Sequence, residues 1–259
     1  MAAQAARLEA DIALAQALAD ASGRAIRPYF RAAFDQQVKS DASPVTQADR
    51  EAEAAIRALL ERERPQDGII GEEYGEERAD AERVWVLDPI DGTRSFIAGR
   101  PIFGTLIALL EQGRPILGVI DQPISGERWI GAVGRSTLLN GAPVRSRRDR
   151  PLNQAIFATT APWFCPAFET LQQKTGDTLL GGDCYNYALL ASGQVDLVIE
   201  EGLKLYDYAA LVPVVEGAGG VMTDWSGAPL GLGGSGQVVA AANVALLAEA
   251  LPLLESSRN

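Results

Sequence analysis

The stretch from Trp85 to Thr93 constrains this chain more than any other. It opens with an apolar run typical of a buried strand and leads directly into Asp88-Pro89-Ile90-Asp91-Gly92-Thr93. Two aspartates three positions apart at a Pro/Gly turn suit neither a continuing strand nor a core helix, but they can present two carboxylates to one hard cation. The N–H groups of Gly92 and Thr93 and the Thr93 hydroxyl could then hold a phosphate, as loop-to-helix junctions do. The alternative is a strand that ends in an ordinary Asp-Gly turn.

The composition is that of a globular protein with an acidic balance. The 259 residues are enough for one large domain or two fused subdomains, and the 47% hydrophobic and 22% charged fractions are ordinary. The net charge of −11 argues against nucleic acid as a main partner, because phosphate backbones need a basic footprint. An acidic protein with an anionic substrate needs positive charge at its site, and bound metal ions supply it.

The chain contains no histidine, which excludes several kinds of catalysis. Ser-His-Asp and Cys-His mechanisms, His-ligated zinc and phosphohistidine chemistry all need that residue. The two cysteines, Cys165 and Cys184, have neither the number nor the spacing of a disulfide framework or a zinc site. An enzyme with this composition must use carboxylates, hydroxyls, Lys, Arg and metal-bound water.

The chain shows no sign of a targeting or membrane segment. The Ala-rich start, Met1–Asp20, lacks the basic and apolar blocks of a signal peptide. No apolar run approaches the roughly 20 residues that a membrane span needs. We therefore expect a cytoplasmic protein with no membrane partner.

Hydrophobic periodicity predicts alternating helices and strands. Helices are expected at residues 5–34, from 46 to before Pro65, 167–174, 206–217 with a bend at Pro213, and 244–254, and residues 182–192 form a loop that leads into another helix. Strands are expected at 68–71, 84–87, 105–110, 116–120, 129–133, 156–159, 195–200 and 238–241. The Arg-rich segment from Arg145 to Pro151 predicts a boundary between an N-terminal half, residues 1–145, and a C-terminal half, residues 151–259.

Four acidic features follow one another along the chain. Asp49 lies in the first turn of the second helix, where a capping box with Thr46 is its ordinary role. Ile69-Ile70-Gly71-Glu72-Glu73 is a strand-like segment that ends in two glutamates, and the Asp88–Thr93 turn follows it. Leu205-Tyr206-Asp207-Tyr208 places an aspartate at a helix start, before a Gly-rich segment at 217–220. In this order, from about Lys39 to Gly220, the features resemble the inositol monophosphatase superfamily of magnesium-dependent, lithium-sensitive phosphatases.

The resemblance implies a role for each matching residue. The metal ligands would be Glu72, Asp88, the carbonyl of Ile90, Asp91 and Asp207, and they would hold two or three Mg²⁺ ions, with Mn²⁺ as a possible substitute. Asp49 and Thr93, together with Glu72, would activate the attacking water, and Gly92 and Thr93 would contact the phosphate. Oxygen-only ligands independently favour Mg²⁺ or Mn²⁺ over zinc. The other glutamates near Glu72 (Glu73, Glu76 and Glu77) are interpreted as surface charges or helix caps.

The resemblance also implies a fold and an assembly. The family fold is an α/β (α+β) layered sandwich, with helices around an antiparallel-rich sheet and a second, smaller mixed sheet. The active site would lie between the two halves, most metal ligands in the first half and the substrate-binding residues in the second. The family usually dimerises, so a homodimer is expected.

Two further carboxylates bear on the substrate. Asp183 and Glu200 match family positions beside the organic half of the substrate, and together they favour a cationic one. The segments Gly182-Asp183-Cys184-Tyr185, Arg94-Ser95-Phe96 and Tyr206–Pro213 resemble the histidinol-phosphate phosphatase branch. The ammonium and imidazole groups of histidinol would then bind these carboxylates, and Tyr185 or Tyr206 could add a cation–π face.

Several alternatives stay open at this point. Asp183 could cap the helix that follows it, and Arg94 could contact the phosphate or cover the rim of the site. The substrate of this phosphomonoesterase could also be inositol-1-phosphate or a broad range of sugar phosphates. From a different class, the chain could be a catalytically inactive, metal-binding regulatory relative.

Overall fold

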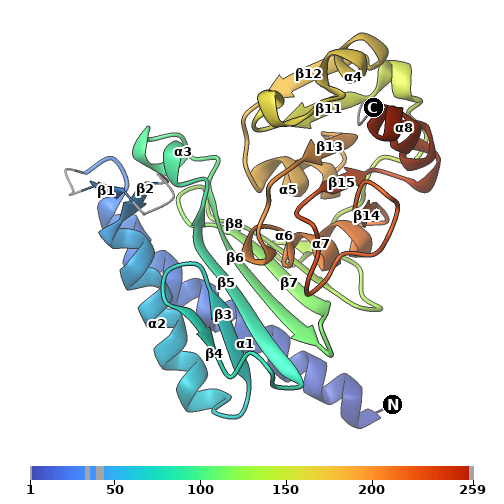
Figure 1. Ribbon diagram of the computed structural model, residues 1–259. Coiled ribbons are helices and arrows are strands. Elements are labelled where there is room, and N and C mark those ends of the chain that lie inside the picture. The colour runs from blue at the N-terminus through green and yellow to red at the C-terminus, as the bar shows by residue number, and fades with distance from the viewer. Residues whose placement is uncertain (1, 33–35, 39–43, 257–259) are drawn as a thin grey trace.

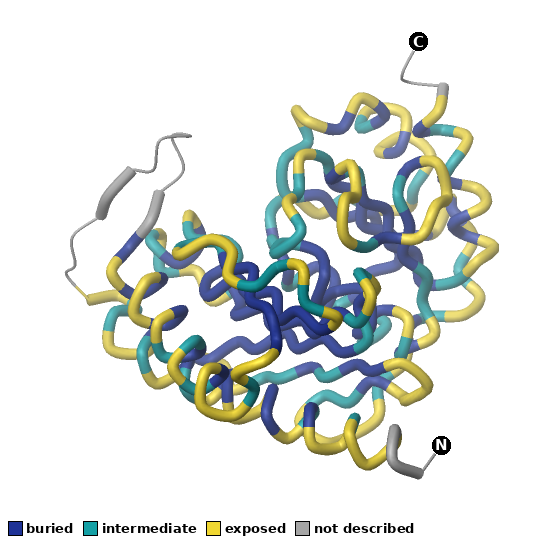
Figure 2. The backbone as a smooth tube through the Cα atoms, turned by 60° about the horizontal axis from the view of Figure 1, so that its bottom comes forward, coloured by how far each residue is buried: buried dark blue, intermediate teal, exposed yellow. Residues whose placement is uncertain are grey.

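The chain folds into alternating layers of helix and sheet because its central strands are apolar on both faces. In β5 (Arg83–Asp91), Val84 and Val86 join one buried cluster while Trp85 and Leu87 join another. A strand buried on both faces needs a covering layer on each side. The computed structural model, which describes residues 2–32, 36–38 and 44–256, shows these layers (Figure 1). The buried segments run through the middle of the stack (Figure 2).

The larger sheet has eight strands in the order β10-β9-β8-β7-β6-β5-β3-β4, and all pairs except β3–β5 are antiparallel. Helices α1 (Ala2–Ile26) and α2 (Gln47–Glu63) cover its outer face, and a strand pair, β1 (Gln36–Val38) with β2 (Pro44–Thr46), precedes α2. The other strands of this sheet are β3 (Gly68–Gly71), β4 (Gly75–Glu77), β6 (Gly104–Glu111), β7 (Arg114–Gln122), β8 (Glu127–Ala132), β9 (Leu138–Leu139) and β10 (Ala142–Pro143).

The smaller sheet is mixed, with five strands in the order β12-β11-β13-β15-β14. These are β11 (Ile156–Thr159), β12 (Asp177–Leu180), β13 (Leu197–Glu200), β14 (Val221–Thr223) and β15 (Val238–Ala241). Between the two sheets lie α5 (Tyr185–Ala191), α6 (Leu205–Tyr208) and α7 (Leu211–Gly217). On the outer side lie α4 (Phe168–Lys174) and α8 (Val244–Ser256). The predicted layered sandwich is confirmed.

Two predicted helices have different bounds. The first ends at Ile26 and continues as a 3₁₀ turn, Arg27–Tyr29, because Pro28 has no N–H for an α-helical bond. Residues 33 and 34 of that prediction, and Lys39, lie outside the described residues. The helix predicted at 206–217 is divided into α6 and α7, so Pro213 lies in the first turn of α7, where a proline costs no hydrogen bond. The continuous helix predicted here is therefore wrong, because the helix is interrupted at Ala209 and Ala210, in the turn before Pro213.

Among the described residues, seven strands escaped prediction. Four are the short paired strands β1, β2, β9 and β10, and the other three, β4, β12 and β14, lie at the edges of the two larger sheets. Edge strands are half-exposed and do not need the apolar alternation by which strands are predicted. In β4, for example, all three residues are exposed, including Glu76 and Glu77, which were interpreted as surface charges.

The Arg-rich segment joins the two sheets, but it is not a free linker. The buried Ser146 hydroxyl donates to the Ala242 carbonyl at 2.8 Å, and Arg147 donates to the Asp196 carboxylate at 2.9 Å. Asp196 is fully buried and also accepts from the Ile156 N–H. One buried cluster extends from the first sheet through α5 and α7 to the second. The division into residues 1–145 and 151–259 stays a prediction.

Two glycines let the middle layer approach the larger sheet. A Cβ on Gly118 of β7 would lie 1.9 Å from the Ala210 carbonyl oxygen, and one on Gly131 of β8 would lie 2.1 Å from the Pro213 oxygen. Both oxygens are backbone atoms at or just after the junction of α6 and α7, and a side chain cannot rotate away from them. Glycine at these positions therefore sets how closely α6, which carries Asp207, lies against the sheet.

We predict that Gly118→Ala lowers the free energy of unfolding by about 1–3 kcal/mol, as overpacking does, and also weakens the rise in melting temperature on adding Mg²⁺. The matched control is Gly126→Ala, whose Cβ would meet no atom within 4 Å. The control costs only left-handed backbone strain, about 1 kcal/mol, and keeps the Mg²⁺ response. A Gly118→Ala protein with the parent's Mg²⁺ response would contradict this account.

Candidate active site

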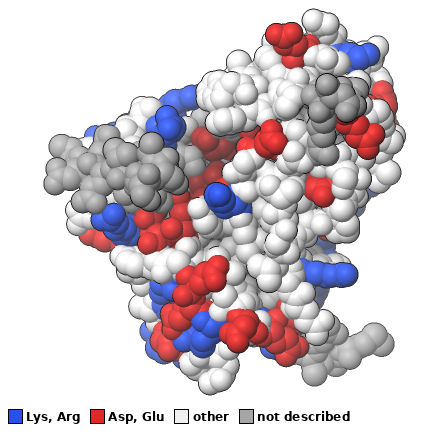
Figure 3. Space-filling model, in the orientation of Figure 1, with Lys and Arg blue, Asp and Glu red and all other residues white. Residues whose placement is uncertain are grey.

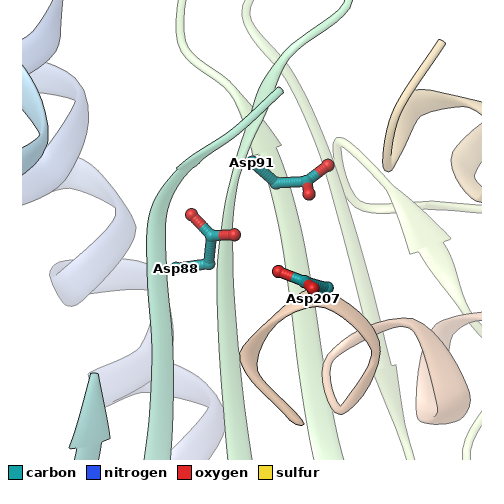
Figure 4. A group of neighbouring side chains, drawn as sticks. All are labelled: Asp88, Asp91 and Asp207. Carbon is teal, nitrogen blue, oxygen red and sulfur yellow. The ribbon is translucent and has the colours of Figure 1, made fainter. Parts of the chain in front are cut away.

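A β-bulge in β5 turns Asp88 and Asp91 to the same side of the sheet. Asp88 pairs with Leu106 and Asp91 with Gly104, so three steps along β5 match only two steps along β6. Residues three apart in a regular strand point to opposite faces, and one extra residue reverses that relation. Because of the bulge, the two aspartates of Asp-Pro-Ile-Asp, although three residues apart, both point into the same space (Figure 4).

Asp207 completes this group from the second half of the chain. It lies in the first turn of α6, which packs against β5 and β6. The Lys204 N–H donates to its Oδ2 at 2.6 Å. Carboxylate oxygens of Asp88, Asp91 and Asp207 lie within 4.8 Å of one another. The structure thus brings together three of the predicted metal ligands.

Glu72 reaches the same place through the parallel pairing of β3 with β5. Gly71 lies beside Leu87, so the next residue in each strand, Glu72 and Asp88, are also neighbours, and the Glu72 N–H donates to the Leu87 carbonyl at 3.1 Å. Asp88 is buried, and burial is the largest cause that raises its pKa well above the ordinary value. The charges of Glu72, Asp91 and Asp207 raise the pKa of Asp88 further. A bound cation would relieve this repulsion.

Thr93 and Asp49 lie side by side next to this group. The Thr93 hydroxyl is 3.1 Å from the Ile90 carbonyl and 3.4 Å from Asp49 Oδ1, and its single proton can serve one of them at a time. Asp49 Oδ2 accepts from the N–H and the hydroxyl of Thr46. Asp49 therefore caps α2 with one oxygen and faces Thr93 with the other. Burial raises the pKa of Asp49, and the charge of Glu72 raises it further.

Gly92 is required where β5 passes into α3 (Thr93–Ile97). Its φ of +84° is left-handed, and a Cβ here would lie 2.6 Å from Asp183 Oδ2. The turn therefore brings the second half of the chain against the proposed phosphate site. Arg94, the next residue but one, is exposed on α3, and its role stays a prediction.

A cavity of about 170 Å³ opens beside these carboxylates. It is lined by Asp91, Thr160, Ala161, Phe164, Asp183, Cys184, Tyr187, Glu200, Glu201, Leu203, Asp207 and Leu211. Figure 3 shows acidic side chains gathered in the hollow between the part that carries α2 and α3 and the part that carries the smaller sheet. The cavity joins the predicted metal site to both predicted substrate carboxylates.

Asp183 faces α3 and the cavity. Its Oδ2 accepts from the Ser95 hydroxyl at 2.7 Å, and its own N–H donates to the Thr160 hydroxyl at 3.1 Å. The following helix, α5, begins at Tyr185 with Cys184 as its N-cap and no side-chain cap. The alternative that Asp183 caps this helix is therefore wrong. Burial raises the pKa of Asp183, whereas the Ser95 bond and the charge of Arg100 lower it.

Glu200 lies at the end of β13 with 5% of its surface exposed. Burial raises its pKa to about 7, and the charge of Asp183 acts in the same direction. The Thr160 N–H donates to its Oε1 at 2.7 Å. Thr160 therefore contacts both residues that sequence reasoning assigned to the substrate, Asp183 at its backbone N–H and Glu200 at its carboxylate.

The prediction that Tyr185 or Tyr206 faces the substrate is wrong, and Tyr187 lines the cavity instead. Tyr185 turns away from the cavity, because its hydroxyl donates to Glu127 at 2.7 Å and its ring meets Trp129 edge-on. Tyr206 does not line the cavity either. Tyr187 does, and its buried hydroxyl has no hydrogen-bond partner among the described residues. No sequence signal favoured Tyr187 over Tyr185, because which tyrosine faces the cavity depends on where α5 begins.

The cavity also contains residues that sequence reasoning did not assign. The Cys184 N–H donates to Asp91 Oδ2 at 2.6 Å, so Cys184 acts through its backbone rather than its thiol. Glu201 follows Glu200 and accepts from Gln237 at 2.8 Å. Phe164 lies in a 3₁₀ turn, Pro162–Phe164, with over half its surface exposed. No motif marks the last two residues, which reach the cavity only through the fold.

Comparisons with known proteins cover nearly the whole chain. A model of the inositol monophosphatase family matches residues 7–258. The chain is 56% identical over 224 residues to the bifunctional phosphatase IMPL2, chloroplastic, of Arabidopsis thaliana, a match that covers 83% of this chain and 64% of that protein, less than two thirds of its length. It is 36% identical over 237 residues to a histidinol-phosphatase of Chlorobaculum parvum, covering 89% of this chain and 92% of that protein.

A solved structure is similar over the same extent. An inositol monophosphatase from Zymomonas mobilis matches with a TM-score of 0.88 and 54% identity, over 95% of this chain and 98% of that one. Within residues 2–32, 36–38 and 44–256, the structure has no helix with the length and apolar character of a membrane span.

We predict that Asp88→Asn abolishes most metal binding, because it removes one charge from the group and keeps the volume. Calorimetric titration with Mg²⁺ should show a loss beyond the roughly 10–100-fold that even an indirect contact to a metal contributes. Without metal the variant should melt no earlier than the parent, since one repelling charge is gone. The control is Asp80→Asn, at an exposed position. Unchanged Mg²⁺ affinity in Asp88→Asn would refute the metal site.

A second prediction concerns pH. The pKa of Glu200 is about 7 in the folded protein and 4.5 ordinarily, so between these values the folded protein holds a proton that the unfolded chain has released. The contribution of Glu200 to stability therefore falls as pH rises from about 4.5 to about 7.

Because Glu200→Gln does not titrate, its free energy of unfolding relative to the parent should rise by up to about 3 kcal/mol across that range. Urea melts at pH 5 and pH 8 without metal measure this difference. The exposed Glu169→Gln is the control and should show no such change. A Glu200→Gln difference that is independent of pH would show that Glu200 is ionised at both values.

Proposed function

The chain belongs to the inositol monophosphatase family, and on this premise we propose that this phosphatase hydrolyses histidinol phosphate to histidinol and phosphate, a step of histidine biosynthesis. One observation carries the choice of substrate. Asp183 and Glu200 line the same cavity as Asp91 and Asp207, so an ester whose phosphate meets the cation site has two carboxylates beside its organic half. The similarity to a histidinol-phosphatase supports the same choice.

The donor set fits magnesium. The residues that would hold the ions are Glu72, Asp88, Asp91 and Asp207 with the Ile90 carbonyl, and oxygen donors without nitrogen or sulfur suit Mg²⁺ or Mn²⁺. When two or three ions are bound, they neutralise the phosphate dianion and lower the pKa of water at the site.

The chain's own groups then position the water and receive its proton. The Thr93 hydroxyl can pass a proton to Asp49 Oδ1, 3.4 Å away, while it accepts from water. Burial and the charge of Glu72 raise the pKa of Asp49 and so favour its role as proton acceptor. The N–H groups of Gly92 and Thr93 bind phosphate oxygens, and Arg94 at the rim attracts the incoming anion.

The organic half of histidinol phosphate fits the rest of the cavity. Its ammonium group pairs with Asp183 or Glu200 as a charge-assisted hydrogen bond. The Tyr187 hydroxyl, which has no partner among the described residues, offers a donor to an unprotonated imidazole nitrogen. Phe164 and Leu203 provide apolar surface for the ring.

A second substrate has its own support. The similarity to a bifunctional phosphatase and to an inositol monophosphatase structure favours inositol-1-phosphate, or a wider set of sugar phosphates, as the alternative. A regulatory relative without activity would be expected to lack a ligand, yet every matched ligand position is filled. Release of phosphate in the presence of Mg²⁺ separates an enzyme from that regulatory relative.

Two further properties are part of the proposal. We propose a homodimer in the cytoplasm, acting on a small-molecule phosphomonoester without nucleic acid or membrane as a partner. Multi-angle light scattering of the purified protein tests the dimer, and a mass of one chain would contradict it.

The proposed substrate is tested by comparing kcat/KM for histidinol phosphate and inositol-1-phosphate at one Mg²⁺ concentration. We expect a higher value for histidinol phosphate, loss of both activities in EDTA, and inhibition by Li⁺, which the family resemblance implies. A higher value for inositol-1-phosphate would transfer the assignment to the alternative. No release from either ester would contradict the enzyme assignment for these substrates.

We predict that Asp183→Asn lowers kcat/KM for histidinol phosphate by roughly 10- to 100-fold, the worth of a charge-assisted hydrogen bond. Inositol-1-phosphate should be hydrolysed almost as before, because asparagine can still accept the Ser95 bond and the cation site keeps its ligands. Asp177→Asn, at an exposed position of β12, is the matched control. Equal losses on both substrates would mean that Asp183 only supports the site.

A further inference from the structure

Glu53 is a fully buried carboxylate on a helix that lies at the surface. A buried charge is costly unless it is paired and hydrogen-bonded. Glu53 meets this condition with three donors. Its Oε1 accepts from Arg57 Nε at 2.7 Å and from the Tyr74 N–H at 3.2 Å, and its Oε2 accepts from the Glu73 N–H at 2.8 Å.

These bonds hold the turn that joins β3 to β4. The two backbone donors, Glu73 and Tyr74, follow Glu72 directly in the chain. Arg57 continues the contact, because its guanidinium donates to the Gly75 carbonyl and lies 3.5 Å from the Glu77 carboxylate. We call Glu53 and Arg57, one helical turn apart, the α2 clamp.

The α2 clamp also contacts the residue before Glu72. A Cβ on Gly71 would lie 2.0 Å from Glu53 Oε1, so no side chain fits at Gly71 while Glu53 holds its place. The Glu53 carboxylate therefore lies against the backbone on both sides of Glu72. That arrangement restricts the main chain at Glu72.

The same helix carries Asp49 one turn earlier. Residues four apart share a helix face, so Asp49 and Glu53 both point toward the larger sheet, and both are buried. Asp49 faces Thr93 directly, whereas Glu53 reaches Glu72 through the backbone. One rigid helix thus sets the separation between Asp49 and Glu72.

From these contacts we propose that Glu53 is a positioning residue, which holds Glu72 through the N–H groups of Glu73 and Tyr74 at the place that cation binding requires. The inference rests on the metal site of the proposed function. It assigns to α2 a second contribution to that site beyond Asp49.

The test is Glu53→Gln with calorimetric Mg²⁺ titration of the purified protein. Glutamine keeps the size, but its NH₂ group cannot accept, so the amide cannot satisfy the Glu73 N–H and the other two donors together. We expect Mg²⁺ affinity to fall roughly 10- to 100-fold, as with other residues that orient a ligand. The control is Glu63→Gln, exposed on the same helix and paired with Arg62, which should keep the parent's affinity.

The melting temperature of Glu53→Gln without metal distinguishes a role in positioning Glu72 from a role in the stability of the whole fold. A Glu53→Gln protein that melts earlier but binds Mg²⁺ as the parent does would overturn the inference. If that variant does not fold, Arg57→Gln keeps the Glu53 carboxylate and removes half of the α2 clamp. We expect it to weaken Mg²⁺ binding less strongly than Glu53→Gln, and unchanged affinity in that folded variant would also overturn the inference.

The titration distinguishes this inference from the function on which it rests. If the parent protein does not bind Mg²⁺, the proposed metal site fails and the phosphatase mechanism with it. If the parent and Glu53→Gln bind equally well, the metal site stands and only the role of Glu53 is wrong. A higher Mg²⁺ requirement for half-maximal phosphate release in Glu53→Gln would support the inference independently.

Discussion

Repulsion between carboxylates is the constraint on which this structure depends. The fold forces Asp88, Asp91 and Asp207 within 4.8 Å of one another, and burial with their mutual charge raises the pKa of Asp88 and of Asp91. Such a group either binds protons or needs a positive charge that stabilises its charged form. Each acid also receives a backbone donor: the Ile90 N–H for Asp88, the Cys184 N–H for Asp91 and the Lys204 N–H for Asp207. These bonds aim the oxygens but do not cancel their charge, which a bound cation would do.

Backbone donors explain why the acids lie at the ends of elements rather than within them. Interior N–H groups are used by the helix or strand itself, whereas the residues just outside have donors to spare. Asp207 is in the first turn of α6, Glu200 ends β13, and Glu72 follows β3. Even Asp88, inside β5, lies at the bulge where the ladder is interrupted. The carboxylates therefore lie where β3, β5 and β13 end and α6 begins, and the fold brings these four places together.

The sequence predicted the acidic residues and the layered fold better than it predicted the contacts that position those residues. Asp88 and Asp91 were identified because carboxylates beside Pro and Gly are unusual in a strand, and Asp207 because the ordered acidic features resemble the family. The apolar strands were identified by their runs. The bulge was not, since one extra residue leaves no compositional mark until the partner strand is known. Glu53 was missed for a related reason: its partners are N–H groups twenty residues later, which any sequence supplies. Tyr185 was preferred to Tyr187 because helix facing depends on where α5 begins.

The two ends of the proposed substrate meet different halves of the chain. The phosphate end depends on β3, β5, α2 and α3, together with Asp207, whereas Asp183 and Glu200 come from the smaller sheet and its connections. Gly92, with no Cβ to separate it from Asp183, is one place at which these two sets touch, beside the Ser95–Asp183 hydrogen bond. A substitution at position 183 or 200 can therefore change which organic group is accepted while the carboxylates of the cation site keep their backbone donors. Under the proposed function, this separation would let one fold accept several substrates, since specificity and chemistry would be carried by side chains from different elements.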